Sequence, residues 1–374
     1  MVHERKYRQS PPIMGDFSSI PGEVLGLIFE HICKNPFLDD LSFEELWKEW
    51  RSIVGVSKEW KTVAVEKLRH LLPRAISLTL QDDEVSLPEL RGKLCLGSNN
   101  GWLLIADISK DRRQMFLLNP LSKHQLPLPP PPCRLRCKRR LLFTVKFKST
   151  TDYQVAICRD RMNPPFFSQI FVCKTGDAKW TILKAMWPHA EDVAFYNQKL
   201  YVIYDLEEFH VFSEINGTCK DKLYFRSTVF DEGEYPEGRS YLVETPQKEL
   251  LKIIRYTKMK FRGGNGKTID FQVFKVDDKS IDEDWLDEEE NGDKVWDKVE
   301  DLGDNVVFLG VNSLCLLAQD VPGCTGNSIY FTDYQDTKED RGVFRMEDRE
   351  IKPLFQDRPF KPAPMLWFTP DLNS

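Results

Sequence analysis

The sequence predicts a small all-α domain of three helices followed by a large all-β domain. Apolar residues recur at helical spacing between about residues 20 and 70, which is typical of amphipathic helices. Beyond Pro73, short runs of β-branched and aromatic residues alternate with Gly, Asn, Asp and Pro, which is typical of strands joined by turns. The 374 residues also exceed the usual size of one domain, so two unequal domains fit the length of the chain.

The composition narrows the possible function classes. The formal net charge of -6 gives no basic footprint for nucleic acid, so nucleic acid is not an expected partner. Nine cysteines and six histidines are scattered without the spacing of a disulfide framework or a metal site. We therefore expect reduced thiols, no metal, no cofactor, and a location in the cytoplasm or the nucleus. The longest apolar stretch, Val306–Ala318, is too short to cross a membrane, so a membrane is not an expected partner either.

The chain begins with a polar segment and then changes character. Residues 1–15 contain prolines and lack the apolar segment of a secretory signal, so we expect a disordered N-terminal tail. Pro21 marks the first turn of a helix, because the missing N–H of proline is not needed at that position. Val24, Leu25 and Ile28 follow at spacings that place them on one helical face.

Two more helices complete the predicted α-domain, residues 16–72. The second follows a break at Asn35 and Pro36, and the third begins near Ser57, whose hydroxyl is a suitable N-cap. The apolar residues at helical spacing are Phe43, Leu46, Trp47, Trp50, Ile53 and Val54 in the second helix, and Trp60, Val63, Ala64 and Leu68 in the third. Three short helices bury too little surface to be stable alone, so this domain needs a partner or a neighbouring domain.

Two segments of the helical domain resemble the F-box family. Ile20–Phe29 is similar to the Leu-Pro-x-Glu-Leu-Leu opening of an F-box, and Val56–Lys61 is similar to its closing segment. The sequence departs from the family at Ser57, where cysteine is usual, and at Lys61, where arginine is usual. The stretch between the two segments is also longer than in the common form.

The F-box resemblance implies docking onto the adaptor subunit of an SCF-type, cullin-based ubiquitin ligase. The contact would use apolar side chains of the first helix and of the region around the third. These candidate adaptor-binding residues are Ile20, Pro21, Val24, Leu25, Ile28, Phe29, Val56 and Trp60.

The second domain contains many short predicted strands and no helical pattern between them. They fall at residues 102–105, 115–118, 142–147, 154–158, 170–173, 200–204, 210–212, 241–244, 250–256, 270–276, 306–309, 328–331 and 342–345. Strands this short and this numerous are typical of a sandwich, a barrel or a propeller.

The order of the segments favours a propeller. Met115–Pro129 and Ile170–Trp180 each contain an apolar strand, a turn and a second strand that ends in prolines or a tryptophan, which looks like the blade hairpin of kelch-like propellers. At about 40 to 50 residues per blade, roughly 300 residues allow about six or seven blades.

Six strings in this domain resemble the KIB-type β-propeller of plant F-box proteins, and they occur in the order of that family. The strings are Ser98–Leu103, Leu118–Ser122, Asp192–Tyr196, Phe308–Asn312, Gly326–Asp333 and Leu366–Pro370. Together with the F-box, the resemblance covers nearly the whole chain and assigns residues 73–374 to the propeller.

Three further segments have local interpretations. The run Gly263–Thr268 is similar to a phosphate-binding loop, but Phe261 stands where that loop needs a glycine and a strand follows, so a hairpin tip is favoured. Gly326 and Asn327 are expected to form a positive-φ turn before a buried strand. Residues 277–304 lack the residue order of a calcium loop and are interpreted as an acidic mobile loop, with docking of a basic partner as the alternative.

These observations predict a non-catalytic substrate receptor of a ubiquitin ligase. The F-box would dock the adaptor, and through it the cullin, while the propeller binds a target protein that the sequence does not identify. Two alternatives stay open: a propeller enzyme, a hydrolase or lyase, in which the helices only cap the fold, and an F-box interaction protein that acts outside the ligase.

Overall fold

Strands make up nearly all of the regular structure in the described part of the chain. The computed structural model describes residues 74–77, 93–107, 114–119, 122–132, 141–149, 152–161, 167–183, 190–204, 208–213, 220–225, 237–260, 264–276, 296–321, 323–332, 340–353 and 365–368. The chain divides into two units, Met1–Arg69 and His70–Ser374, and every described residue belongs to the second. The predicted tail and the three predicted helices of residues 1–72 lie outside the described residues.

Four sheets contain four strands each, and in each sheet the strands lie side by side in chain order. Blade 1 is β2 (Leu94–Asn99), β3 (Trp102–Asp107), β4 (Gln114–Leu118) and β5 (Gln125–Leu128), and blade 2 is β6 (Leu141–Phe147), β7 (Tyr153–Arg161), β8 (Phe167–Lys174) and β9 (Thr181–Leu183). Blade 3 is β10 (Asp192–Tyr196), β11 (Lys199–Ile203), β12 (Glu208–Ser213) and β13 (Lys220–Phe225), and blade 4 is β14 (Glu237–Glu244), β15 (Leu250–Lys260), β16 (Gly264–Val276) and β17 (Trp296–Val299). All neighbouring strands in blades 1 to 4 are antiparallel, which is the up-and-down order of propeller blades.

The fifth sheet departs from this simple order. Blade 5 has the strand order β19-β18-β20-β21-β22, and β18 and β20 are parallel. Its strands are β18 (Asn305–Leu309), β19 (Ser313–Leu317), β20 (Ser328–Phe331), β21 (Gly342–Arg345) and β22 (Ile351–Pro353), with a short 3-10 helix η6 at Ala318–Asp320. Within the described residues, no helical stretch has both the length and the apolar character that a membrane span requires.

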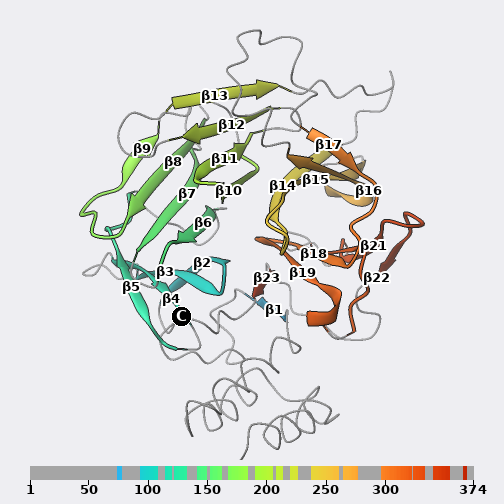
Figure 1. Ribbon diagram of the computed structural model, residues 1–374, viewed down its shortest axis with the longest axis horizontal. Helices are drawn as coiled ribbons and strands as arrows, with labels where there is room; N and C mark the ends of the chain where they lie inside the picture. Colours follow the sequence, from blue (N-terminus) through green and yellow to red (C-terminus); the bar gives the residue numbers. More distant parts are fainter. Residues whose placement is uncertain are drawn as a thin grey trace, which may run out of the picture. The chain divides into compact units, whose positions relative to one another are not determined.

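The sheets follow one another around a common centre (Figure 1). Contacts link β2 to β6, β6 to β10, β10 to β14 and β14 to β19, so one strand of each blade lies on the inner side. Between blades 5 and 1 lies a two-stranded antiparallel sheet of β1 (Arg74–Ser77) and β23 (Met365–Phe368), in which Ala75 pairs with Trp367. The ring of blades is therefore closed by pairing the first described strand with the last.

A separate hydrophobic cluster fills the space between each pair of neighbouring blades. Trp102 of blade 1 and Phe171 of blade 2 belong to one cluster, and Phe271 of blade 4 and Phe344 of blade 5 belong to another, with ring centroids 5.1 Å apart. Each of these side chains is almost fully buried. Where a strand is covered on both faces it is a continuous buried run, as in β3 and β4, whereas the outer strand β5 alternates between exposed and buried residues.

The β-propeller fold and its strands agree with the sequence. Every strand predicted above falls on a described strand, but several described strands are longer than predicted, such as β14, β15 and β16 by four to six residues at one end. The Gly-rich run before Ile269 lies at the start of β16, where it pairs with β15 as a hairpin. The described strands form five full blades and the two-stranded sheet. The predicted count was six or seven blades, and six is approached only if that closing sheet is taken as an incomplete sixth blade.

Two local expectations need correction. The predicted mobile loop of residues 277–304 is wrong from Trp296 onward, because Trp296 is buried and begins β17, which pairs with the end of β16. Asn327 has the predicted positive φ of 55°, but Gly326 does not share it. Gly326 serves a close approach instead, since a Cβ there would lie 3.0 Å from the carbonyl oxygen of Gly303.

The two-residue turn between β10 and β11 contains a strained position. Asn197 and Gln198 both have positive φ, 41° and 65°, as a type I′ hairpin requires. Asparagine tolerates this region, whereas glutamine does so at a cost that glycine avoids. We expect Gln198→Gly to raise the free energy of unfolding by about 0.5 kcal/mol, because strain is relieved by more than chain entropy is lost.

The matched control for this turn is Gln247→Gly, measured in the same denaturation experiment with full-length protein. Gln247 is also exposed in a hairpin turn, but its φ is not positive, so glycine there only adds freedom to the unfolded chain. Equal effects of the two substitutions on the denaturation midpoint would show that Gln198 is unstrained.

Candidate functional site

The inner strands of the propeller have an edge that no further strand covers. Backbone N–H and C=O groups at such an edge need partners when they are shielded from water. In this protein, polar side chains from the neighbouring blade supply many of them.

Blades 1 and 2 are joined by the turn between β2 and β3. The Asn99 Oδ1 accepts a hydrogen bond from the backbone N–H of Val145 at 3.1 Å, and the Asn100 Nδ2 donates to the carbonyl oxygen of Val145 at 3.2 Å. Asn100 and Gly101 have positive φ, 48° and 78°, which brings the turn close to β6. Two adjacent amides therefore satisfy both backbone groups of one residue on the next inner strand.

The same arrangement continues between blades 3 and 4. The Asp192 Oδ2 accepts from the backbone N–H of Leu242 at 2.9 Å, and the Glu191 Oε2 accepts from that of Ser240 at 2.7 Å. The other Asp192 oxygen accepts from the N–H of Val193 at 2.9 Å. Both carboxylates thus cap the edge of a strand with oxygens that accept from backbone N–H groups.

The last joints involve blade 5 and the closing strand. The Ser313 hydroxyl donates to the carbonyl oxygen of Leu242 at 2.8 Å. The Asn312 amide accepts from the N–H of Trp367 at 2.8 Å and donates to its carbonyl oxygen at 2.6 Å. These contacts tie β19 to blade 4 on one side and to β23 on the other.

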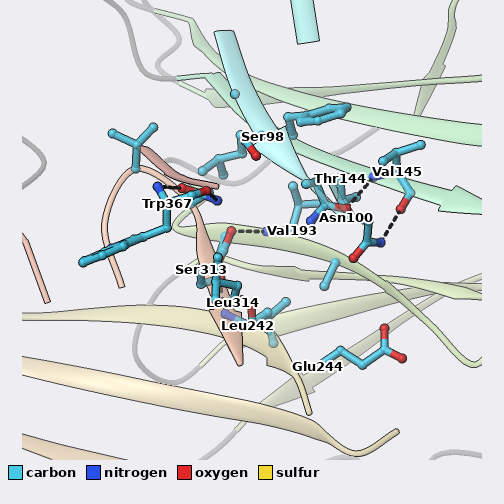
Figure 2. A pocket seen from close by; sticks show the side chains of 18 of the residues that line it. Ser98, Asn100, Thr144, Val145, Val193, Leu242, Glu244, Ser313, Leu314 and Trp367 are labelled. Carbon is cyan, nitrogen blue, oxygen red and sulfur yellow. Dashed lines mark hydrogen bonds between the residues drawn. The ribbon is translucent and has the colours of Figure 1, made fainter. Parts of the chain in front are cut away.

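These side chains surround a central cavity of about 180 Å³, which Figure 2 shows from close by. It is lined by β2, β6, β10, β14, β19 and their turns, and by Trp367 of β23. Ser98, Thr144 and Ser313 contribute hydroxyl groups to its wall. This volume can hold several ordered waters but is smaller than that of a usual ligand pocket, so we describe it as a polar cavity.

The titratable groups of the cavity wall are Asp192, Glu244 and Cys315. Asp192 is occupied by backbone donors, and the Glu244 carboxylate pairs with the Lys248 ammonium at 2.9 Å. Burial raises the pKa of the Cys315 thiol to about 12, so it stays protonated and is a poor nucleophile at neutral pH. Among the described residues of the wall, these groups form no nucleophile paired with a base.

The described part of the chain also contains no group of three or more His, Cys, Asp or Glu side chains placed to hold a metal ion. Its cysteines are free thiols, namely Cys95, Cys158, Cys173, Cys315 and Cys324. The predicted adaptor-binding residues, from Ile20 to Trp60, all lie outside the described residues, so their use stays a prediction.

The hydrogen bonds that side chains of one blade make to the backbone of the next were not predicted, although several of the residues that make them lie in segments quoted above. Asn99, Asn100, Asp192, Asn312 and Trp367 all lie in the strings that resemble the KIB-type propeller. The sequence signal that could have indicated these hydrogen bonds is a short polar residue at the start or end of a predicted strand, where its side chain can cap the edge of a neighbouring strand.

The comparisons with known proteins agree with this architecture. The family model described as KIB1-4 beta-propeller matches residues 76–345. Two Arabidopsis thaliana proteins with F-box names, At3g25750 and At2g17690, are 24% and 22% identical to this chain. Each alignment covers 90% of this chain, and they cover 93% and 96% of the respective relatives. A third, At4g17565, also named as an F-box protein, is 24% identical over 70% of this chain and 67% of its own length.

Proposed function

The chain belongs to the KIB1-4 β-propeller family, and from this premise we propose that it is the substrate-recognition subunit of an SCF-type ubiquitin ligase. In this proposal residues 16–72 form a three-helix F-box that docks the adaptor, and the propeller binds the target protein. Catalysis of ubiquitin transfer belongs to other subunits. The chain contributes proximity, because a bound target lysine has a high effective concentration near the ubiquitin-loaded subunit.

One observation mainly supports the proposal: relatives named as F-box proteins align with this chain over nine tenths of its length. The similarity therefore extends beyond the propeller into the N-terminal region, where Ile20–Phe29 and Val56–Lys61 resemble the two halves of an F-box. The polar cavity described above supports it as well, because its Asp192 carboxylate caps a strand edge and its Glu244 carboxylate pairs with Lys248, which leaves no acid–base pair in the described wall.

Capture of the adaptor by the purified full-length chain tests the proposal. We expect the double variant Leu25→Asp with Trp60→Ala to recover on the order of 100-fold less adaptor than the wild type, because an unpaired carboxylate in an apolar contact costs several kcal/mol. The matched control is Ile182→Asp, which places the same charge on an apolar side chain that is 57% exposed on β9. This control should capture the adaptor as well as the wild type does.

Equal recovery of the adaptor by the double variant and the wild type would remove the assignment. Loss of adaptor capture together with a lowered melting temperature would be a folding effect, so thermal unfolding is measured on the same samples. Adaptor capture without any cullin-dependent change in the abundance of a bound target would place the protein outside the ligase.

A further inference from the structure

The wall of the central cavity contains three hydroxyl groups that come from three different blades. Ser98 lies near the end of β2 in blade 1, Thr144 lies on β6 in blade 2, and Ser313 begins β19 in blade 5. Figure 2 labels all three among the residues of the wall. The hydrogen bonds that these hydroxyl groups make within the protein differ, and each group retains some hydrogen-bonding capacity.

The Ser98 hydroxyl has the most capacity left. Ser98 is 2% exposed, and its hydroxyl makes no hydrogen bond to any residue that the structure describes. A serine hydroxyl can donate one hydrogen bond and accept two. Because a buried polar group without a partner costs free energy, a molecule in the cavity that bonds to this hydroxyl would recover that cost.

Thr144 and Ser313 are each satisfied in one sense only. The Thr144 Oγ1 accepts from the backbone N–H of Phe195 at 3.4 Å, and none of the described acceptors receives its own hydrogen. The Ser313 hydroxyl donates to the carbonyl oxygen of Leu242 at 2.8 Å, so its oxygen can still accept. Thr144 therefore presents a donor to the cavity wall, Ser313 presents an acceptor, and Ser98 can serve as either.

This combination selects the chemical class of the ligand. An ammonium or guanidinium group has donors only, so it cannot accept from Thr144. A carboxylate has acceptors only, so it cannot donate to Ser313, and it would also meet the two charged residues of the described wall, the carboxylates of Asp192 and Glu244. A hydroxyl group both donates and accepts, so a neutral molecule with several hydroxyl groups matches all three positions.

Apolar side chains occupy the wall between the hydroxyl groups. Val193, Leu242 and Leu314 are among the lining residues. The carbon atoms of a polyol can contact these side chains through dispersion, while its hydroxyl groups replace the hydrogen bonds of the waters that it displaces. A polyol is therefore favoured over waters alone as the occupant of this mixed wall.

The volume of the cavity limits the size of the ligand. Apolar cavities of about 150 Å³ bind a molecule as large as benzene. At about 180 Å³, the central cavity has room for roughly six to ten non-hydrogen atoms. This corresponds to a polyol or sugar of about four or five carbon atoms, well below the size of the ligands that fill larger pockets.

We propose that the central cavity is a binding site for a small neutral polyol, which hydrogen-bonds to Ser98, Thr144 and Ser313. The ligand accepts from Thr144, donates to Ser313 and bonds to Ser98 in either sense. The proposal does not depend on the ligase role, because every residue that carries it belongs to the propeller.

The first test compares probes of graded chemistry on the purified full-length chain by saturation-transfer difference NMR. Erythritol and xylitol are the polyol probes, and they should give signals that saturate as their concentration rises. The butanediol that lacks the inner hydroxyl groups of erythritol should bind at least threefold more weakly than erythritol, because it cannot reach all three hydroxyl groups of the wall. Sucrose exceeds the volume of the cavity and should give no saturable signal.

The second test changes one hydroxyl group of the protein. Ser98→Ala should bind erythritol about fivefold more weakly than the wild type, because one hydrogen bond to the ligand is lost. The matched control is Ser240→Ala, since Ser240 is fully buried, its hydroxyl also has no partner among the described residues, and it lies outside the cavity wall. This control should stay within about 1.5-fold of the wild type.

Four outcomes would overturn the proposal. Absence of a saturable signal from both polyols would mean that the cavity holds water only, and equal affinity for erythritol and the butanediol would mean that the hydroxyl groups are not recognised. Binding of sucrose as tight as that of erythritol would place the polyols on the surface, and equal effects of Ser98→Ala and Ser240→Ala would remove the role of Ser98. Thermal unfolding of both variants checks that they fold, and the probe series on the wild type decides the question without any variant.

Discussion

Trp367→Ala should lower the free energy of unfolding by about 3 to 5 kcal/mol, one of the two largest effects expected for a single substitution in the propeller. The Trp367 side chain is 3% exposed, and its ring centroid lies 4.9 Å from that of Phe308. The indole Nε1 donates to the carbonyl oxygen of Leu309 at 3.0 Å. Truncation therefore leaves a large cavity and removes one hydrogen bond from this carbonyl oxygen, which still accepts from the backbone N–H of Thr332 at 2.9 Å.

The position of Trp367 in the fold increases this effect. β23 pairs with β1, and its Trp367 backbone is hydrogen-bonded to the Asn312 side chain. Trp367 therefore joins the two ends of the propeller unit. Space around it is tight, because a Cβ on Gly310 would lie 3.0 Å from the indole nitrogen. Loss of the Trp367 side chain therefore weakens the contact that closes the ring between blade 5 and blade 1.

Thermal or urea denaturation of the full-length protein measures this prediction. Trp180→Ala is the comparison, because Trp180 is partly buried on the outside and donates to the carbonyl oxygens of Pro129 and Pro130 at 3.2 and 3.1 Å. We expect a distinctly smaller loss there. A Trp367→Ala variant that unfolds at the same midpoint as the Trp180→Ala variant would contradict the closing role of β23.

The blade strands were predictable because their local composition is enough to identify them as strands. Runs such as Ile170–Cys173 and Leu200–Ile203 are apolar, β-branched and bounded by turn residues, and each is a buried strand in the structure. The inner strand β2 is less apparent in the sequence, since Gly97, Ser98 and Asn99 have low strand propensity and line the cavity. Its polar end is explained by the neighbouring blade, which the sequence does not display.

Contacts between distant segments could not be predicted from local sequence. The stretch Val306–Ala318 looks like a single apolar segment, but Asn312 and Ser313 divide it into β18 and β19 and bind two other parts of the ring. The pairing of β1 with β23 joins residues almost 300 positions apart, for which no local propensity exists. The polar residues of the candidate site were likewise unpredictable from local sequence, since each one caps a strand of another blade.

A buried ion pair between blades 4 and 5 gives the second large expected effect. The Arg255 guanidinium on β15 donates to the Asp340 carboxylate at 2.5 Å, and the two side chains are 6% and 8% exposed. Arg255 also donates to the Thr268 hydroxyl at 2.7 Å and to the carbonyl oxygen of Thr332 at 3.0 Å. The second Asp340 oxygen accepts from the N–H of Thr268 at 2.9 Å, so both charged groups are fully hydrogen-bonded.

The charged forms persist in spite of burial. Burial opposes the charge of Arg255, but Tyr241 and Asp340 outweigh it and raise the pKa of the guanidinium above its ordinary value. The Phe331 ring lies 4.8 Å from the guanidinium carbon and covers it on one side. Removing the carboxylate leaves a cation in this apolar setting with no countercharge.

Asp340→Ala should therefore lower the free energy of unfolding by about 3 to 5 kcal/mol, whereas Arg255→Met combined with Asp340→Leu should be distinctly less destabilised than Asp340→Ala alone. The reason is that the double variant removes the stranded charge together with its partner and fills the space with apolar atoms. The cycle is completed with the single variants Arg255→Met and Asp340→Leu, which are compared with the wild type and the double variant by their urea midpoints at neutral pH. Strictly additive losses in the double variant would mean that the two side chains act independently, and that the Arg255 charge is stabilised by Thr268 and Thr332 without help from Asp340.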